Sequence, residues 1–372
     1  MAGAEPVAVG PQGPLEHGLP VGERFASLTQ AIETLQPLLT GYLLRHLGDE
    51  GEPYSDYRPF ADLLSVGLDG PRLAHYAWVL ARAHRASGVP AAGRAVRAVL
   101  KALLPALKRH GAGTWLSRGE EPSSIAELAF LLLCQCDGGA VGAARAKELA
   151  ATLWGCIDLH GRFAPFRDLE HDHDAYQDYY PCQALLALGR ACEEELCEVD
   201  KPRLDRALRY YGHRFRARHD WGMVSWLPQA CAAWHRVEDD VRFADLACEV
   251  ADWALTYQQV KSGAFLNDHQ PDTPGYTTAV YLEGVAAAAS IAALRGDARG
   301  HRRYLNACER GLRFVDRLVY QERDRPVLPN LPWALGGVRT SLVRSDVRID
   351  FVQHALAAVL SIHAAKSGTQ RP

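Results

Sequence analysis

Two kinds of helical segment alternate along the chain, and this alternation limits the possible fold more than any other feature. One kind is rich in Ala and Leu on most of its faces, as expected for a buried helix. Six such segments occur, at 72–84, 123–136, 181–192, 223–235, 277–294 and 350–364. The other kind has one apolar stripe and one charged face, as in a helix with one side in water. These segments occur at 27–48, 91–111, 142–161, 203–219, 240–260 and 300–321.

The buried segments recur at intervals of about 46 to 70 residues, which is enough for one helical hairpin with its loops. Alternation of buried and half-solvated helices indicates an inner and an outer ring. An open α-solenoid is the alternative, but it needs polar capping repeats, and neither end of this chain has a distinct one. We therefore predict an all-α fold, an (α/α)6 toroid with no long β-strand.

The length of 372 residues allows one large closed fold or two average domains. We expect a flexible lead-in over 1–24, the toroid over 25–366 and a disordered tail over 367–372. A net charge of -3 gives no basic field for a nucleic acid. The first residues lack the basic and apolar runs of a secretory signal or a membrane span.

The cysteines indicate the cellular compartment. There are nine, an odd number, and no two are spaced as a CxxC pair. This pattern favours reduced, mostly buried thiols in a cytoplasmic protein. The sequence does not indicate an oligomeric state.

Polar residues collect in the loops that enter the buried segments. In a toroid these loops all face one end of the central cavity, so residues distant in sequence can converge there. The loop before 181–192 carries Asp178 with Tyr176, Tyr179 and Tyr180. Proline is favoured in the first turn of a helix, so Pro181 predicts that the helix begins there.

Three further features near the second and third buried segments each allow two interpretations. Ser124 and Glu127 have the spacing of a capping box, which is the simpler reading of that pair. His171 and His173 lie beside carboxylates and could bind zinc, or they could belong to a mobile solvated loop; we predict no metal. Cys182 lies near a helix N-terminus that could activate it, but a buried structural cysteine is favoured.

The next two loops add aromatic and acidic groups. Asp220 stands beside Trp221 and Trp226, whose indoles could hold a sugar face or an isoprenoid chain, or simply pack. The following loop contributes His269 and Tyr276. Glu283 is an isolated carboxylate on an apolar helix, so we expect it to face the cavity or an arginine and to suit a general acid.

The last loop contributes Trp333, Arg339, Arg348, Asp350 and His354. The two arginines could clamp a carboxylate of a ligand, or they could form structural ion pairs with Glu283 or Asp350. For Arg348 the structural pairing is favoured.

Two segments carry a resemblance to a known group of proteins. DYYPCQALLAL at 178–188 and WALGGVRTSLVRSDVRIDFVQHALAAVL at 333–360 are similar to segments of bacterial toroid proteins of ill-defined activity. The chain as a whole resembles the glycosidase-like (α/α)6 toroid superfamily. That superfamily includes unsaturated glucuronyl hydrolases, N-acylglucosamine 2-epimerases and the C-terminal domain of glucuronyl C5-epimerases. The resemblance covers roughly residues 25–365, with motif-level matches only in these two segments. Cys182 and Gln183 stand where Gly and Glu are usual, so a carboxylate of that helix start is missing.

The resemblance and the polar loops together predict an enzyme that acts on a carbohydrate-like or uronate-like small molecule by general acid–base catalysis. Hydrolase, lyase and epimerase reactions all remain open, and no cofactor is expected. Asp178 or Asp220 would be the base and Glu283 or Asp350 the acid, with His269 and His354 moving protons. The predicted substrate-binding residues are Tyr176, Tyr179, Tyr180, Trp221, Trp226, Tyr276, Trp333, Arg339 and Arg348.

Two other functions are weighed against this prediction. A cyclase or isomerase of an isoprenoid or other natural product would use an apolar cavity and an acid such as Asp174, but the chain has no DxDD run. A toroid could also be a non-catalytic binding or assembly module. A small molecule is the only partner predicted, without a nucleic acid or a membrane.

Overall fold

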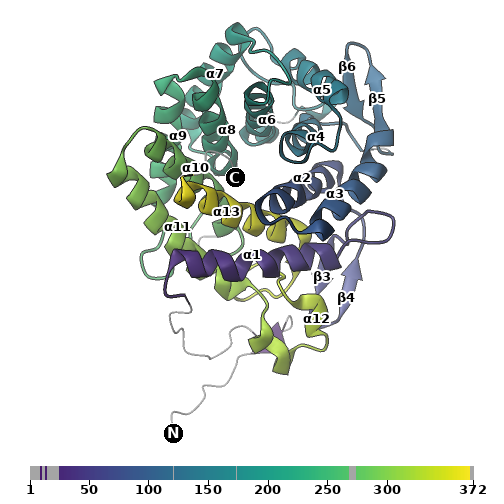
Figure 1. Cartoon of the computed structure of the whole chain (residues 1–372), viewed down its shortest axis with the longest axis vertical. Helices are drawn as coiled ribbons and strands as arrows, with labels where there is room; N and C mark the ends of the chain where they lie inside the picture. Colours follow the sequence, from purple (N-terminus) through teal and green to yellow (C-terminus); the bar gives the residue numbers. More distant parts are fainter. Residues whose placement is uncertain are drawn as a thin grey trace.

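The helices form two concentric rings (Figure 1). The structure is a computed structural model that describes residues 25–119, 121–172, 174–267 and 274–368, with the backbone of 9–10 and 13–14. The inner ring consists of α2 (Gly70–Ser87), α4 (Ile125–Gly138), α6 (Tyr180–Glu193), α8 (Gly222–Glu238), α10 (Thr277–Leu294) and α13 (Ile349–Ser367). The outer ring consists of α1 (Leu28–Arg45), α3 (Pro90–Leu103), α5 (Ala143–Gly155), α7 (Lys201–Arg218), α9 (Val241–Leu255) and α11 (Ala298–Leu318).

The inner ring is closed. Each inner helix packs against the next one along the chain, and α13 returns to pack against α2. The six predicted buried segments are the six inner helices, and the six predicted half-solvated segments are the outer ones. The predicted closed arrangement is therefore confirmed, and the open solenoid is wrong.

Small residues let the inner helices approach one another closely. A Cβ added at Gly284 of α10 would lie 1.9 Å from the carbonyl oxygen of Val224 in α8. Real atoms cannot be this close, so only glycine permits this crossing of the two helices. Gly284 is thus a packing requirement of the ring.

The strands among the described residues are short. β3 (Asp56–Arg58) lies between β4 (Leu63–Ser65) and β7 (Val347–Arg348) in one antiparallel sheet. The pairing of Asp56 with Arg348 joins the first loop of the ring to the start of its last inner helix. This small sheet therefore helps to close the ring.

The predicted helix at 91–111 is too long. Helix α3 ends at Leu103, and β5 (Leu107–His110) then pairs antiparallel with β6 (Gly113–Leu116). Pro105 lacks the N–H that would continue the α-helical hydrogen bonds, and a 3-10 turn at Leu104–Ala106 follows α3 instead.

The local helix starts follow the sequence signals. Ser124 and Glu127 form the predicted capping box at the start of α4. Pro181 lies in the first turn of α6, as predicted.

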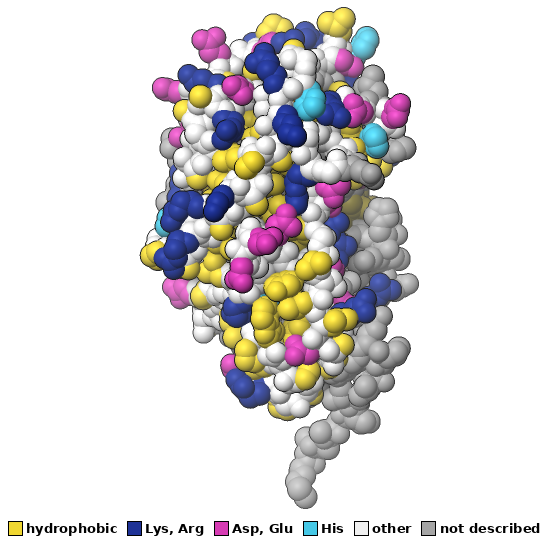
Figure 2. Space-filling model, turned by 90° about the vertical axis from the view of Figure 1, so that its right-hand side faces the viewer, with side chains coloured by type: hydrophobic (Ala, Val, Ile, Leu, Met, Phe, Trp, Pro, Cys, Tyr) yellow, Lys and Arg dark blue, Asp and Glu magenta, His cyan; other side chains and the backbone are white. Residues whose placement is uncertain are grey.

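On the face shown in Figure 2, acidic and basic side chains are interspersed, so this face has no large patch of one charge.

Helix α10 is the most apolar helix of the ring. Among the described helices, α10 alone has the length and hydropathy of a membrane span, but 72% of that segment is buried inside the ring. This burial is that of a core helix.

Candidate functional site

A large cavity lies at the end of the ring where the inner helices begin. Its volume is about 900 Å³. The first turns of α2, α6, α8, α10 and α13, together with the loop residues just before them, supply most of its wall. Helix N-termini carry partial positive charge, so this end of the ring favours negatively charged and hydrogen-bond-accepting groups.

The cavity brings together ten of the predicted site residues from four separate loops. They are Asp178, Tyr179, Tyr180, Asp220, Trp221, Trp226, Tyr276, Arg348, Asp350 and His354. These loops converge at one end of the ring, as expected for a toroid. The roles of the residues in binding or catalysis stay predictions.

Three predicted site residues lie outside the wall of this cavity. Tyr176 packs edge-on against Phe166 with ring centroids 4.8 Å apart. Trp333 packs edge-on against His46, with centroids 5.0 Å apart. Arg339 is buried and donates from Nε to the carbonyl of Leu318 at 3.4 Å.

One predicted residue, His269, lies outside the described residues.

Glu283 lies beneath the cavity. It is fully buried and lines a different pocket, at the opposite end of the inner ring. Its Oε1 is 2.7 Å from Nδ1 of His354, and its Oε2 accepts from Nε2 of Gln229 at 3.3 Å. A carboxylate only accepts hydrogen bonds, so Nδ1 of His354 carries a proton in this pair, and in the neutral imidazole the lone pair is then on Nε2.

Most carboxylates of the cavity are held by arginines. Asp178 receives Nε of Arg214 at 2.6 Å and Nη2 at 3.0 Å. Arg348 donates from Nε to Asp350 at 3.0 Å. The structural pairing favoured for Arg348 is therefore present.

The paired carboxylates differ in their electrostatics. Hydrogen bonds from Arg214 and Arg218 lower the pKa of Asp174 to about 2, the larger effect coming from Arg214. Burial raises the pKa of Asp178, although the hydrogen bond from Arg214 opposes this change and the charge of Asp220 adds to it. Of the two, Asp178 is the carboxyl more easily protonated.

Asp220 accepts a hydrogen bond from the backbone, in contrast to the carboxylates that are bonded to arginines. Its Oδ1 accepts the backbone N–H of Gly222 at 2.8 Å. A Cβ at Gly222 would lie 3.1 Å from Oδ1 of Asp220 and 3.3 Å from Cβ of Asp178. Glycine therefore leaves room for two carboxyl groups at the start of α8.

The floor of the cavity is a layer of aromatic rings. The imidazole of His75 stacks on Phe130 at 4.6 Å and lies 4.9 Å from the ring of His354. Trp226 contacts the same group at 5.5 Å from Phe130. Burial lowers the pKa of His75 well below its ordinary value, so this ring is neutral at physiological pH.

Three buried polar atoms on the wall of the cavity have no hydrogen-bond partner in the protein. They are Nε2 of His75, Oε1 of Gln183 and Nε1 of Trp221. Buried polar atoms normally have partners, so these atoms indicate a place for a ligand or ordered water.

Several wall residues escaped the sequence analysis. They are Asp69, Arg72, His75, Arg218 and Tyr281. Asp69 caps α2 and pairs with Arg72, in the same loop position as the acidic residues of the other units. An acidic residue just before the first buried helix was therefore the sequence signal that could have identified Asp69.

Neither a thiol nor a metal cluster stands out. Burial raises the pKa of Cys182 well above its ordinary value, which favours the structural interpretation over a nucleophile. Over 25–119, 121–172, 174–267 and 274–368, no three His, Cys, Asp or Glu side chains could together hold a metal ion. The histidine pair considered for zinc includes His173, which lies outside the described residues.

Comparisons with solved structures identify the fold. A D-mannose isomerase superposes with a TM-score of 0.64 at 12% identity, covering 92% of this chain and 100% of the isomerase. A heparin-specific unsaturated glucuronyl hydrolase superposes with a TM-score of 0.62 at 11% identity, covering 92% and 99%. A cellobiose 2-epimerase from Bacillus thermoamylovorans gives 0.61 at 13% identity, covering 89% and 97%. The chain has the (α/α)6 toroid fold.

The fold does not determine the reaction. No protein-family model and no curated protein matches the sequence. The similar structures include enzymes named for isomerisation, epimerisation and hydrolysis. At identities near one residue in eight, the toroid alone does not choose among these reactions.

Proposed function

We propose that this toroid is an enzyme that isomerises or epimerises a sugar by moving a proton between carbon and an imidazole. The observation that carries the proposal is the pair formed by His354 and Glu283. His354 lines the cavity, and its Nδ1–H is fixed by Glu283 from below. This arrangement leaves Nε2 as a base directed at a bound molecule.

The cavity suits a polar ligand of sugar size. Its volume of about 900 Å³ falls within the range of small-molecule sites. Its wall includes buried polar atoms of Gln183 and Trp221 that have no partner in the protein, and Trp226 offers an apolar face. This mixture of polar atoms and aromatic surface is typical of carbohydrate sites.

The state of the carboxylates favours proton transfer at carbon over glycoside cleavage. Cleavage needs one protonated carboxyl to act as acid and a second as base or nucleophile. Hydrogen bonds from Arg214 and Arg218 lower the pKa of Asp174, which favours its ionised form, and Asp350 is bonded to Arg348. They therefore suit binding and orientation better than proton donation.

A glycoside hydrolase is the second candidate, and one observation favours it. Burial raises the pKa of Asp178, and Asp178 lies near Asp220, so this pair offers a more easily protonated carboxyl beside a second carboxyl. An acid and a base of this kind are what glycoside cleavage requires.

Incubation of the enzyme with a panel of free aldoses, ketoses and disaccharides in D2O separates these reactions. We expect a new sugar isomer, with deuterium from solvent on the carbon that loses its proton, followed by proton NMR. His354→Asn should abolish both signals. Release of reducing ends from glycosides without deuterium on carbon would instead establish hydrolysis and overturn the proposal.

A further inference from the structure

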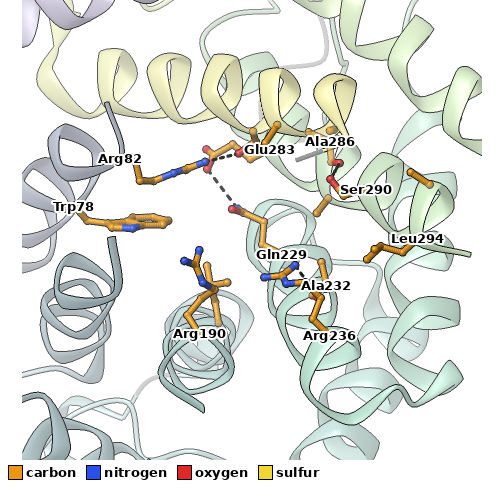
Figure 3. Close-up of a pocket in the computed structure, with 17 residues that line it drawn as sticks. Trp78, Arg82, Arg190, Gln229, Ala232, Arg236, Glu283, Ala286, Ser290 and Leu294 are labelled. Carbon is orange, nitrogen blue, oxygen red and sulfur yellow. Dashed lines mark hydrogen bonds between the residues drawn. The ribbon is translucent and has the colours of Figure 1, made fainter. Parts of the chain in front are cut away.

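A second pocket lies at the opposite end of the ring, where the inner helices end (Figure 3). Its volume is about 240 Å³. Trp78 lines this pocket, whereas Phe130 and Trp226, which pack beside Trp78 in the aromatic layer, line the candidate active site. No residue lines both cavities, so the two are separate.

The buried arginine Arg82 determines the chemistry of this pocket. Its side chain is 1% exposed and extends from α2 toward the centre of the pocket in Figure 3. Its Nη2 donates to Oγ of Ser361 at 2.9 Å, and its guanidinium lies 5.0 Å from the ring centroid of Trp78. The Nε–H and Nη1–H groups of Arg82 have no partner.

Nearby carboxylates do not neutralise Arg82 directly. Within the described parts of the chain, no carboxylate forms a salt bridge with it. The carboxylates at this end are bonded elsewhere: Asp137 to Arg85 and Arg190, Glu193 to Arg190 and Arg236, and Glu283 to His354 and Gln229. The charges of Asp137 and Glu283 act on Arg82 only without direct contact, and a buried charge without a direct partner is unfavourable, so an added anion in contact with it would stabilise this position.

The rest of the wall indicates what kind of anion fits. Most of it is apolar and comes from Leu186, Ala232, Ala286, Ala287, Leu294 and Ala365. The guanidinium of Arg82 carries one positive charge and forms no salt bridge with the described carboxylates, so an anion with a single negative charge matches it. The alanines offer a surface for a compact apolar body rather than for the hydrogen bonds of a sugar or a dianion.

We propose that this second pocket binds a small organic carboxylate, a monoanion with a compact apolar body. The carboxylate accepts hydrogen bonds from the unpartnered N–H groups of Arg82, and the apolar body lies against α10 and α13. Glu283 lines the same pocket and holds His354 of the candidate active site, so a bound carboxylate lies beside the groups that position the imidazole.

Fluorine NMR and calorimetry with 4-fluorobenzoate test this site in the full chain. We expect saturable binding of 4-fluorobenzoate and none of 4-fluorobenzamide, which has the same shape without the charge. Inorganic phosphate should not compete. Equal binding of the amide, or displacement by phosphate, would overturn the assignment of a carboxylate.

Two pairs of variants locate the bound probe. Arg82→Gln should weaken binding about tenfold to a hundredfold, as expected for the loss of charged hydrogen bonds. Arg216→Gln removes the same charge from an exposed arginine of α7 and should bind normally. Leu294→Glu, at a half-exposed position of the wall, should repel the probe, whereas Leu294→Gln should not.

The second pair keeps the test decisive if Arg82→Gln fails to fold. Unchanged affinity in folded Arg82→Gln, or in Leu294→Glu, would show that the probe binds elsewhere and would overturn the proposal. Normal sugar turnover together with lost benzoate binding would separate this site from the proposed active site.

Discussion

Single residues decide the chemistry at the mouth of the ring, and His354 is the most informative of them. Its Nδ1 faces Glu283, which donates no hydrogen bond as a carboxylate and therefore fixes the imidazole tautomer. Fixing the tautomer and orientation of a histidine in this way is how a second carboxylate usually supports a base. Glu283 is thus a positioning residue.

Replacing the carboxylate tests that role. Glu283→Gln keeps an oxygen that can accept from Nδ1–H but removes the negative charge, so kcat for the sugar should fall about tenfold to a hundredfold. Trp333→Phe is the control, because Trp333 lies outside the cavity wall. Steady-state kinetics and circular dichroism measure activity and folding. Unchanged kcat in Glu283→Gln would contradict this role.

The buried carboxyl group of Glu127 should make the free energy of unfolding depend on pH. Burial raises its pKa from 4.5 to about 8. A group with a raised pKa in the folded state stabilises the fold fully below its unfolded pKa, and this contribution is lost as pH rises through the folded pKa. The contribution should therefore decline between pH 4.5 and about 8.

Glu127→Gln keeps the capping geometry and removes the titration. Urea unfolding of both proteins across this range should show the variant gaining several kcal/mol relative to wild type, since one pKa unit is worth about 1.4 kcal/mol. Glu322→Gln, at an exposed position, should show no such trend. Parallel curves for wild type and Glu127→Gln would contradict the buried, protonated carboxyl.

The sequence could predict residues that stand out from their surroundings, and it missed those that do not. Asp178, Asp220 and Asp350 lie in loops at helix starts, so the toroid prediction was enough to bring them together. Arg82 lies inside a helix whose other residues are mostly apolar, and nothing in the periodicity marks its lack of a partner. Only coordinates reveal which buried atoms remain unpaired.

At the scale of the elements, the contact between α8 and α10 is the tightest constraint described. Gly284→Ala should lower the free energy of unfolding by roughly 1–3 kcal/mol, because its Cβ would collide with a backbone oxygen. Gly155→Ala in α5 meets no neighbouring atom and should be neutral or stabilising. Urea unfolding compares them, and equal stability of the two variants would contradict the close crossing.

Helix limits were less predictable than helix identity. All twelve ring helices could be predicted from their apolar patterns, because burial on most faces or on one face is written in the sequence. The predicted helix at 91–111 extended too far beyond the end of α3, because the apolar pattern continues past Pro105 into β5. Pattern alone does not distinguish a helix from a short strand over four residues.

At the scale of the whole molecule, closure makes the ring a cooperative unit. Helix α13 packs against α1, α2 and α10, and β7 just before it pairs with β3. Removal of the last unit of an open solenoid leaves the other repeats folded, whereas removal of a segment from a closed ring exposes buried faces on both sides.

A chain that ends at residue 346 tests this difference. It lacks β7 and α13, so we expect it to lose the cooperative thermal transition of the full chain, followed by circular dichroism. A transition of nearly full amplitude in the shortened chain would show that the ring does not depend on its closure.

The proposed reaction requires that His354 faces a sugar at the mouth of the ring. The most direct measurement is a structure of the complex with the alditol of whichever sugar exchanges deuterium, since an alditol binds without a carbonyl to react. We predict the alditol in the cavity of about 900 Å³, with one carbon within about 3.5 Å of Nε2 of His354. An alditol bound elsewhere, or one whose carbons all lie beyond reach of that nitrogen, would contradict it.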